Sequence, residues 1–346
     1  MASTDKARVL LVGAGGVGAM ACYALESGGG AEVTAVLRSN YDVVEREGFS
    51  IDSIEHGKGI KGFRPSKIRK SVPNVTDEDL PPFDYIVVTT KNILDVRPNV
   101  LDLIEAAVTP GVSAIVLLQN GLNIELPIIE RFPDNTVLSG VSIISASEPE
   151  KGHIVHEFTD TSKVGPFPSL KVPSSESVAA AKWFVELYNR CGRVNCQFDE
   201  DVSFTRWRKL VYNSSFNSVS AILNMGVVRM RMTRHVVDDL IKPIMAEIFA
   251  TAKAAGVTLP EGLDMQMIRL DPPDEDFLPS MGQDAAKGNY MEVEVIVGAP
   301  LREAERLGVA TPTLKTIYGL LRGLQVKAKE RKGAWKAEFE EDNPYY

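Results

Sequence analysis

The sequence is short of cysteine and histidine. Its three cysteines among 346 residues, Cys22, Cys191 and Cys196, are too few and too unevenly spaced for a disulfide framework or a zinc site. His153 and His156 lie three positions apart in a segment that reads as a strand, so their side chains should point to opposite faces. We therefore expect no bound metal, and a reducing compartment.

Two further absences narrow the function classes. A formal net charge of −8 gives no attraction for nucleic acid or for an anionic membrane surface. No apolar run is long enough to cross a bilayer, and residues 1–6 have neither a signal-peptide core nor an arginine-rich amphipathic pattern. The sequence thus favours a cytoplasmic globular protein, with a length that suits two domains.

A dinucleotide-binding fingerprint opens the chain. The apolar run 9–12 is typical of a buried parallel strand, and the spacing G-x-G-x-x-G follows it directly, before a run of helix-forming residues. In such a loop Gly13 allows a tight turn, Gly15 lets the backbone approach a pyrophosphate, and Gly18 lets the helix pack on the strand. The residues expected to contact the dinucleotide here are Gly13, Ala14, Gly15, Gly16, Val17 and Gly18.

The end of the second expected strand, 32–37, indicates which dinucleotide binds. A fold that binds NAD usually places Asp or Glu at this point for the ribose diol, but positions 36–40 contain neither. They contain Arg38, whose planar guanidinium suits a 2′-phosphate. We therefore expect NADPH/NADP⁺ as the cofactor. The alternative for Arg38 is a solvated surface arginine.

Two more buried strands are expected at 85–89 and 113–118, and polar residues follow both. In an open α/β sheet the ligand lies outside the carboxyl ends of the strands, so Lys91 and Asn120 should face cofactor or substrate. The segment 51–63 suggests a hairpin, and 136–147 and 153–164 suggest two later antiparallel strands.

The pattern becomes helical beyond residue 199. We expect a Rossmann-type α/β domain over 1–199 and an all-α domain over 200–346. In the second domain, Pro243 should kink a helix that ends at Gly256, and Thr311 with Pro312 should begin another.

The first helix of the second domain has a polar stripe. Lys209, Asn213 and Asn217 recur every four residues among apolar neighbours, so they share one face that is either functional or bonded to neighbouring loops. Ser280 precedes an expected helix start that suits a carboxylate ligand. Glu292, expected on that helix, could pair with Lys209 or could be a surface charge.

Taken in order, these motifs resemble the ketopantoate reductase (2-dehydropantoate 2-reductase) family. The resemblance rests on the fingerprint, Leu-Leu-Gln-Asn-Gly at 117–121, Trp-Arg-Lys-x-x-x-Asn-x-x-x-Asn at 207–217, Ser-Met-x-Gln-Asp at 280–284 and Glu292. It implies an N-terminal Rossmann domain, a C-terminal helical domain with the active site between them, and NADPH-dependent reduction of 2-dehydropantoate to (R)-pantoate, a step toward pantothenate and coenzyme A.

The resemblance also implies a role for each matching residue. Lys209 looks like the proton donor to the ketone and Glu292 like the carboxylate that organises it. The residues that match substrate-binding positions are Asn120, Asn213, Asn217 and Ser280. Arg38, Lys91 and Asn120 match cofactor-binding positions, with Arg38 at the 2′-phosphate.

Three alternatives stay open from the residues. The segment 297–300 reads Val-Gly-Ala-Pro where the family often has Asn-Gly, so another 2-oxo acid could be the substrate. A β-hydroxyacid-type dehydrogenase also suits a Lys-x-x-x-Asn helix after a Rossmann domain. A non-catalytic NADPH-binding regulator would not need Lys209, Asn213, Ser280 and Glu292 together. A homodimer is possible.

Overall fold

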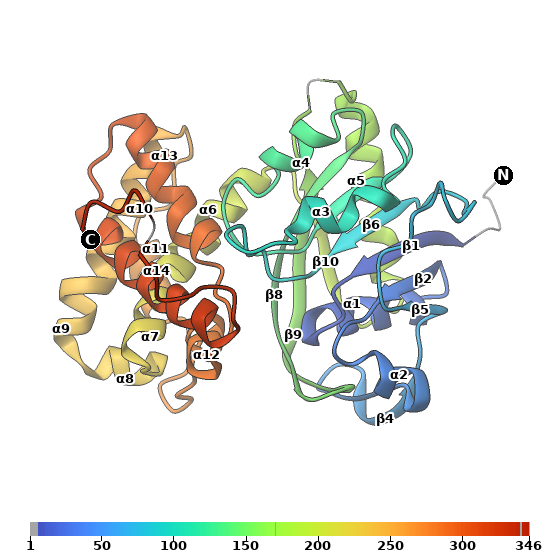
Figure 1. Cartoon of the computed structure of the whole chain (residues 1–346), viewed down its shortest axis with the longest axis horizontal. Coiled ribbons are helices and arrows are strands. Elements are labelled where there is room, and N and C mark those ends of the chain that lie inside the picture. The colour runs from blue at the N-terminus through green and yellow to red at the C-terminus, as the bar shows by residue number, and fades with distance from the viewer. Residues whose placement is uncertain (1–5, 170, 340, 346) are drawn as a thin grey trace. The chain divides into compact units, whose positions relative to one another are not determined.

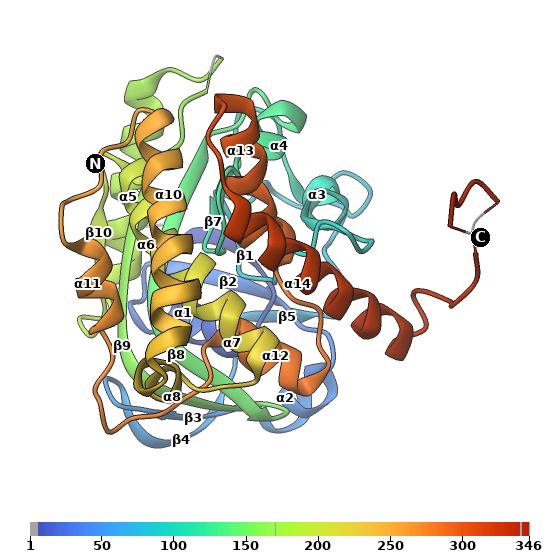
Figure 2. The same ribbon diagram turned by 90° about the vertical axis from the view of Figure 1, so that its left-hand side faces the viewer.

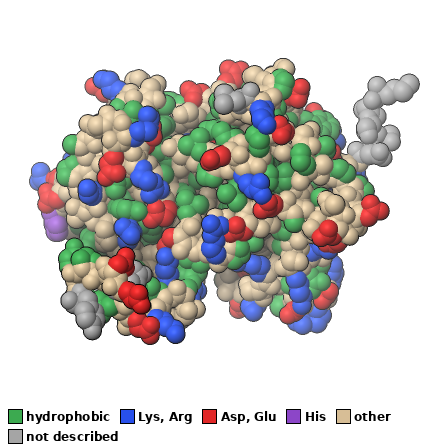
Figure 3. Space-filling view, turned by 45° about the horizontal axis from the view of Figure 1, so that its top comes forward, with side chains coloured by type: hydrophobic (Ala, Val, Ile, Leu, Met, Phe, Trp, Pro, Cys, Tyr) green, Lys and Arg blue, Asp and Glu red, His purple; other side chains and the backbone are tan. Residues whose placement is uncertain are grey.

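The computed structural model describes residues 6–169, 171–339 and 341–345, which form two compact units. Of the described residues, unit 1 comprises those within 6–92 and 96–205, and unit 2 comprises those within 93–95 and 206–345. Within the described ranges no helix is both long and apolar enough to span a membrane. Acidic and basic side chains are interspersed on the face shown in Figure 3, so this face has no broad patch of one sign.

A ten-stranded sheet forms the centre of unit 1 (Figure 1). The strands run in the order β4-β3-β9-β8-β7-β6-β1-β2-β5, and β10 pairs with β9. All pairings are parallel except β3 with β4 and β8 with β9. The strands are β1 (Ala7–Val12), β2 (Ala31–Val36), β3 (Phe49–Ser53), β4 (Gly57–Phe63), β5 (Lys67–Arg69), β6 (Tyr85–Val88), β7 (Ala114–Leu117), β8 (Val137–Glu150), β9 (His153–Pro166) and β10 (Asn195–Phe198).

The central strands of this sheet are buried on both of their faces. Alternate residues of each strand point to opposite faces, and Val9 and Leu10 of β1 are both completely buried. Helices α1 (Gly16–Ser27) and α5 (Ser174–Asn189) pack against the strands and each other, with Met20 and Phe184 in the shared core. The other helices of unit 1 are α2 (Tyr41–Glu47), α3 (Val100–Ile104), the short 3₁₀ turn η1 (Glu105–Ala107) and α4 (Leu126–Arg131).

The sequence predictions for unit 1 are largely confirmed. The Rossmann-type parallel core, the hairpin β3–β4 and the antiparallel pair β8–β9 are all present. The short strands β5 and β10 were not predicted, because three or four residues give no periodic pattern to read. The fingerprint strand β1, the glycine loop after it and helix α1 occupy the positions that the sequence predicts.

Unit 2 consists of helices in the residues described. They are α6 (Val202–Tyr212), η2 (Asn213–Asn217), α7 (Ser218–Leu223), α8 (Val227–Met232), α9 (Arg234–Val236), η3 (Val237–Ile241), α10 (Lys242–Ala254), α11 (Leu263–Ile268), α12 (Ser280–Lys287), η4 (Glu294–Gly298), α13 (Ala299–Leu307) and α14 (Pro312–Arg331), where η2, η3 and η4 are π-helical. Figure 2 shows α12 beside α7, and Gly282 packs so closely on Ser220 that a Cβ would overlap it.

Three helix boundaries show how the sequence directs unit 2. Gly256 has a φ of +89°, and the N–H groups of Gly256 and Val257 bond to Lys253 and Ala252, which ends α10 as predicted. The sequence predicts a simple kink at Pro243. Instead, the π-helical turn η3 precedes this proline and accommodates the N–H group that proline lacks. Pro312 begins α14, but the side chain of Glu247, not that of Thr311, accepts from the N–H groups of Thr313 and Leu314.

Candidate functional site

The three glycines of the fingerprint loop meet different surroundings. Gly13 has a φ of +101°, which side chains rarely adopt, and Gly18 packs so tightly on the Gly13 carbonyl and on Thr89 that a Cβ would overlap them. Gly15 has an ordinary φ of −77°, and a Cβ built on it would meet no atom within 4 Å. Neither conformation nor packing requires glycine at position 15, whereas a ligand lying against the loop would.

The first turn of α1 provides the electrostatic part of this site. No side chain hydrogen bond caps the helix at Gly15, and the first turn contains no acidic residue. The N–H groups at this end and the positive end of the helix dipole therefore suit a phosphate. The loop fits a dinucleotide both in the open space above Gly15 and in its charge.

Polar residues follow adjacent parallel strands of the same sheet. Arg38 and Lys91 are exposed just beyond β2 and β6, and Asn120 is half-buried just beyond β7. The Gln119 side chain donates to the backbone carbonyl of Thr90 at 2.6 Å, which ties the loop after β7 to the loop after β6. The structure therefore brings the segments that carry Lys91 and Asn120 together.

In unit 2, the half-buried Lys209 lies near two buried charged side chains. Burial lowers the pKa of the Lys209 ammonium to about 8, and the nearby positive charge of Arg206 acts in the same direction, whereas Glu292 raises it. Arg206 and Glu292 are only 6% and 4% exposed. An ammonium with a pKa near the working pH can give up a proton during a reaction, unlike an ordinary surface lysine.

Arg206 was missed by the sequence reasoning. It lies three residues before Lys209 on α6, a spacing that places two side chains on one helix face. The pair Arg206 and Lys209 within the motif Arg-Trp-Arg-Lys is the signal that could have identified it.

The two asparagines of the polar stripe are adjacent, although the helix changes type between them. Asn213 and Asn217 bound the π-helical turn η2, and Asn217 Nδ2 donates to Asn213 Oδ1 at 3.1 Å. Both are buried, at 7% and 3% exposure. Within the described residues, Asn217 Oδ1 has no hydrogen-bond partner, so it remains an acceptor that a ligand could satisfy.

The segment 280–292 corrects one prediction. Glu292 does not lie on the helix that Ser280 begins, because Gly288 takes a φ of +67° and ends α12. The carbonyl of Glu292 accepts from Ile296 N–H at the start of the next helical segment, and its burial excludes a surface charge. Ser280 is exposed and is itself the first residue of α12, after Pro279.

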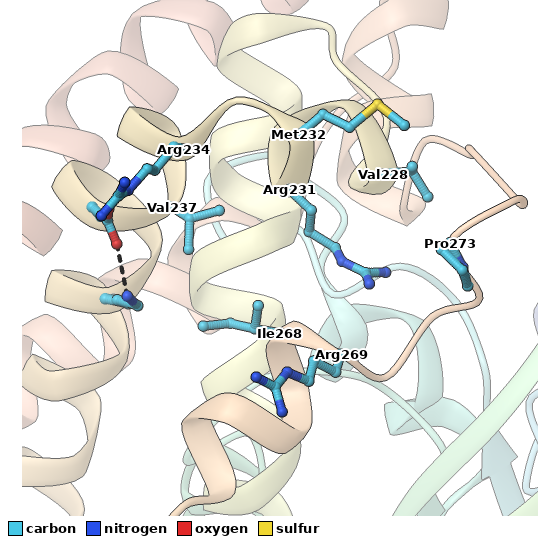
Figure 4. Close-up of a pocket in the computed structure, with 10 residues that line it drawn as sticks. Val228, Arg231, Met232, Arg234, Val237, Ile268, Arg269 and Pro273 are labelled. Carbon is cyan, nitrogen blue, oxygen red and sulfur yellow. Dashed lines mark hydrogen bonds and ion pairs between the residues drawn. The ribbon is translucent and has the colours of Figure 1, made fainter.

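A separate surface pocket of about 500 Å³ occurs in unit 2 (Figure 4). Arg231 and Arg269 extend toward it from the ends of α8 and α11, while Arg234 and Lys242 both pair with Asp238. None of the residues that the sequence singled out lines this pocket. We therefore place the candidate site at the fingerprint loop and at Lys209, not here.

Comparison with known proteins gives consistent matches. The family models described as "Ketopantoate reductase PanE/ApbA" and "Ketopantoate reductase PanE/ApbA C terminal" match residues 9–169 and 201–325. An uncharacterized protein of Saccharomyces cerevisiae is 36% identical over 95% of this chain and 96% of its own. The crystal structure of 2-dehydropantoate 2-reductase from Methylococcus capsulatus is similar with a TM-score of 0.78 and 28% identity, covering 93% of this chain and 97% of that one.

A third neighbour shares the fold. A ternary structure of D-mandelate dehydrogenase with NADH and anilino(oxo)acetate has a TM-score of 0.78 at 21% identity, covering 93% of this chain and 99% of that one. At this identity the similarity establishes architecture alone. The two matched segments together span the fingerprint loop and every candidate residue of unit 2.

Proposed function

Because the chain belongs to the ketopantoate reductase PanE/ApbA family, we propose that it reduces 2-dehydropantoate to (R)-pantoate with NADPH as reductant. Membership makes the chain an oxidoreductase with a nicotinamide dinucleotide cofactor and a small 2-oxo acid substrate. The choice of 2-dehydropantoate, the choice of NADPH and the residue roles are the content of the proposal.

Unit 1 holds the dinucleotide in this account. The open space above Gly15 and the uncapped start of α1 receive the pyrophosphate. Arg38 meets the 2′-phosphate, since no carboxylate occupies positions 36–40 to bind a ribose diol. Lys91 and Asn120, on loops that Gln119 holds together, face the nicotinamide end of the site.

The observation that carries the proposal is the placement of Lys209 close to the buried charges of Arg206 and Glu292, which accompanies its lowered pKa. When bound, a nicotinamide dinucleotide would supply a hydride for C2 of the 2-oxo acid. Negative charge then develops on the carbonyl oxygen, where the Lys209 ammonium stabilises it and donates the proton. With a pKa of about 8, Lys209 is protonated at neutral pH and still acidic enough to transfer its proton.

The remaining side chains of unit 2 bind the substrate. Asn213 and Asn217 form one hydrogen-bonded pair, and the unused Asn217 Oδ1 would accept from a substrate hydroxyl. Ser280, exposed at the start of α12, would donate to the substrate carboxylate. Glu292 holds Lys209 in its charged form, since its negative charge raises the pKa of the ammonium.

The test is NADPH oxidation, followed by absorbance, with a panel of 2-oxo acids. The panel comprises 2-dehydropantoate, 2-oxoisovalerate, benzoylformate and pyruvate, with the Lys209→Ala variant as the control for background oxidation. We expect the highest kcat/KM with 2-dehydropantoate. Faster turnover of benzoylformate or 2-oxoisovalerate would assign another 2-oxo acid, and no turnover of any member would overturn the proposal.

A further inference from the structure

Two side chains from neighbouring strand ends hold the carbonyl groups of the fingerprint loop. Asn40, which follows β2, donates from Nδ2 to the Ala14 carbonyl at 2.9 Å. Thr89, which directly follows β6, donates its hydroxyl to the Gly13 carbonyl. Because β2 and β6 lie on either side of β1, the loop after β1 is fixed from both flanks.

The carbonyl bonds determine where the loop N–H groups point. A trans peptide is planar, and its C=O and N–H point in opposite directions. The Ala14 carbonyl shares its peptide with the Gly15 N–H, and the Gly13 carbonyl shares its peptide with the Ala14 N–H. Holding these two oxygens against Asn40 and Thr89 therefore fixes the planes of both peptides, and with them the directions of the Ala14 and Gly15 N–H groups.

We infer that Asn40 and Thr89 are positioning residues that fix the two peptides after Gly13 and Ala14 in the loop conformation that binds the pyrophosphate of the cofactor. This inference rests on the proposed use of a nicotinamide dinucleotide. It assigns a role to residues outside the G-x-G-x-x-G spacing, which itself identifies only the backbone that binds.

The orientation of Asn40 is itself fixed. Its amide nitrogen also donates to Glu148 Oε1 at 2.8 Å, and the same oxygen accepts from the Gly152 N–H at 2.8 Å. Both partners of the amide are acceptors, so only the NH₂ group fits there. Asn40 is 4% exposed and stands at the N-cap position of α2, yet its side chain makes no capping bond. The side chain is committed to the loop instead of to its own helix.

The β8 strand supports the loop from a further side. A Cβ on Gly16 would overlap the Ala146 carbonyl and the Ser147 nitrogen, so the backbone of β8 lies directly against the loop. Glu148 lies two residues beyond Ala146 on the same strand. The contact at Gly16 and the bond from Glu148 thus join β8, the loop and the end of β2 in one assembly.

The decisive variant is Asn40→Leu, which keeps the approximate size of the side chain, removes both donors and adds no charge near Arg38. We measure NADPH binding by isothermal titration calorimetry in the absence of any 2-oxo acid. The Kd should rise about ten-fold or more, because the loop that binds the phosphates loses one of its two side-chain anchors. The same titration with adenosine 2′-phosphate, which has no pyrophosphate, should give an unchanged Kd.

Matched variants separate positioning from general damage. Asn189→Leu removes a comparable side-chain bond, to the Cys196 carbonyl at 2.6 Å, without touching the loop, and should leave NADPH binding within two-fold. Thr89→Val removes the hydroxyl at constant shape and should weaken NADPH binding, whereas Thr89→Ser restores the donor and should recover it. Glu148→Gln keeps an acceptor for Asn40 and should preserve binding that Glu148→Ala loses.

The outcomes are distinguishable. Equal loss of NADPH and adenosine 2′-phosphate binding in Asn40→Leu, or unchanged NADPH binding in both Asn40→Leu and Thr89→Val, would overturn the inference. If the wild type binds NADPH and the variants behave as expected but no 2-oxo acid is reduced, the proposed reaction fails and the positioning role stands. If the wild type binds no nicotinamide dinucleotide, both fail.

Discussion

The fingerprint loop of unit 1 and the Lys209 face of unit 2 are built on opposite principles. The loop binds through backbone groups, and its key position, Gly15, is defined by the absence of a side chain in open space. The Lys209 face works through side chains, because the charges of the buried Arg206 and Glu292 act on the half-buried Lys209 ammonium. A single Cβ atom added at Gly15 can therefore block the backbone site. The Lys209 site changes when a substitution alters the charges that act on the ammonium.

The largest expected effect is a loss of kcat on substituting Lys209, which tests the side-chain site of unit 2. Lys209→Ala removes the proton donor, and kcat should fall about 10²-fold or more, as for the loss of a general acid. NADPH binding should persist, because the loop of unit 1 is untouched. The measurement is kcat at saturating substrate together with the NADPH Kd, with exposed Lys287→Ala as the matched control. Turnover within a few-fold of wild type would remove Lys209 from the mechanism.

The next largest expected effect is a change in the preference for NADPH over NADH, which tests the cofactor site of unit 1. Arg38→Asp places a carboxylate where a 2′-phosphate would lie and can accept from a ribose diol. The preference of the wild type for NADPH over NADH, about 10- to 150-fold for one charge-assisted contact, should vanish or invert. The ratio of kcat/KM for the two cofactors at one ionic strength checks this. Equal kcat/KM values of the wild type for NADPH and NADH would mean that Arg38 points into solvent and does not contact a 2′-phosphate.

Adjacent glycines separate ligand binding from packing. Gly15→Ala adds a methyl group in open space at an ordinary φ, so the Tm should stay while the NADPH Kd rises about ten-fold. Gly16→Ala forces a methyl group into the backbone of β8 and should cost about 1–3 kcal/mol of unfolding free energy. Thermal melts and titrations on both proteins decide the matter. A fall in Tm for Gly15→Ala with unchanged binding would reverse the assignment.

The smallest effects are shifts in pH dependence. Glu292 raises the pKa of Lys209 and Arg206 lowers it, so Glu292→Gln should move the alkaline loss of kcat to lower pH and Arg206→Met should move it to higher pH. Both shifts should be of the order of one pH unit or less. Opposite shifts in one pH–rate series would show that the two charges act on the same group. Shifts in the same direction would mean that the loop or the substrate titrates instead.

Local patterns account for what the sequence could predict. Gly13, Gly15 and Gly18, the strand 85–89 and the C-cap at Gly256 each depend on neighbours within a few residues, so their spacing carries the information. The bond from Asn40 to Ala14 spans 26 residues and the bond from Asn40 to Glu148 spans 108. No periodicity encodes such pairs, because they arise only when the sheet is assembled.

The same reasoning explains why the local structure around Lys209 and Glu292 in unit 2 was predicted only in part. The four-residue spacing of Asn213 and Asn217 correctly suggested a shared face, but the π-helical turn between them depends on packing within unit 2. The break at Gly288 was visible as a glycine, yet its left-handed conformation decides that Glu292 begins a new segment. The burial of Glu292, and therefore its influence on Lys209, follows from the tertiary fold alone.

The most direct measurement is the pH dependence of kcat between pH 6 and 10, at saturating NADPH and 2-oxo acid, for wild type and Lys209→Ala. Lys209 is the proton donor in this account and has a pKa of about 8. The wild-type kcat should therefore be constant below that pH and fall as the ammonium is lost above it. The residual activity of Lys209→Ala should lack this limb. An identical alkaline limb in the variant would contradict the assignment of Lys209 as the group that gives the proton.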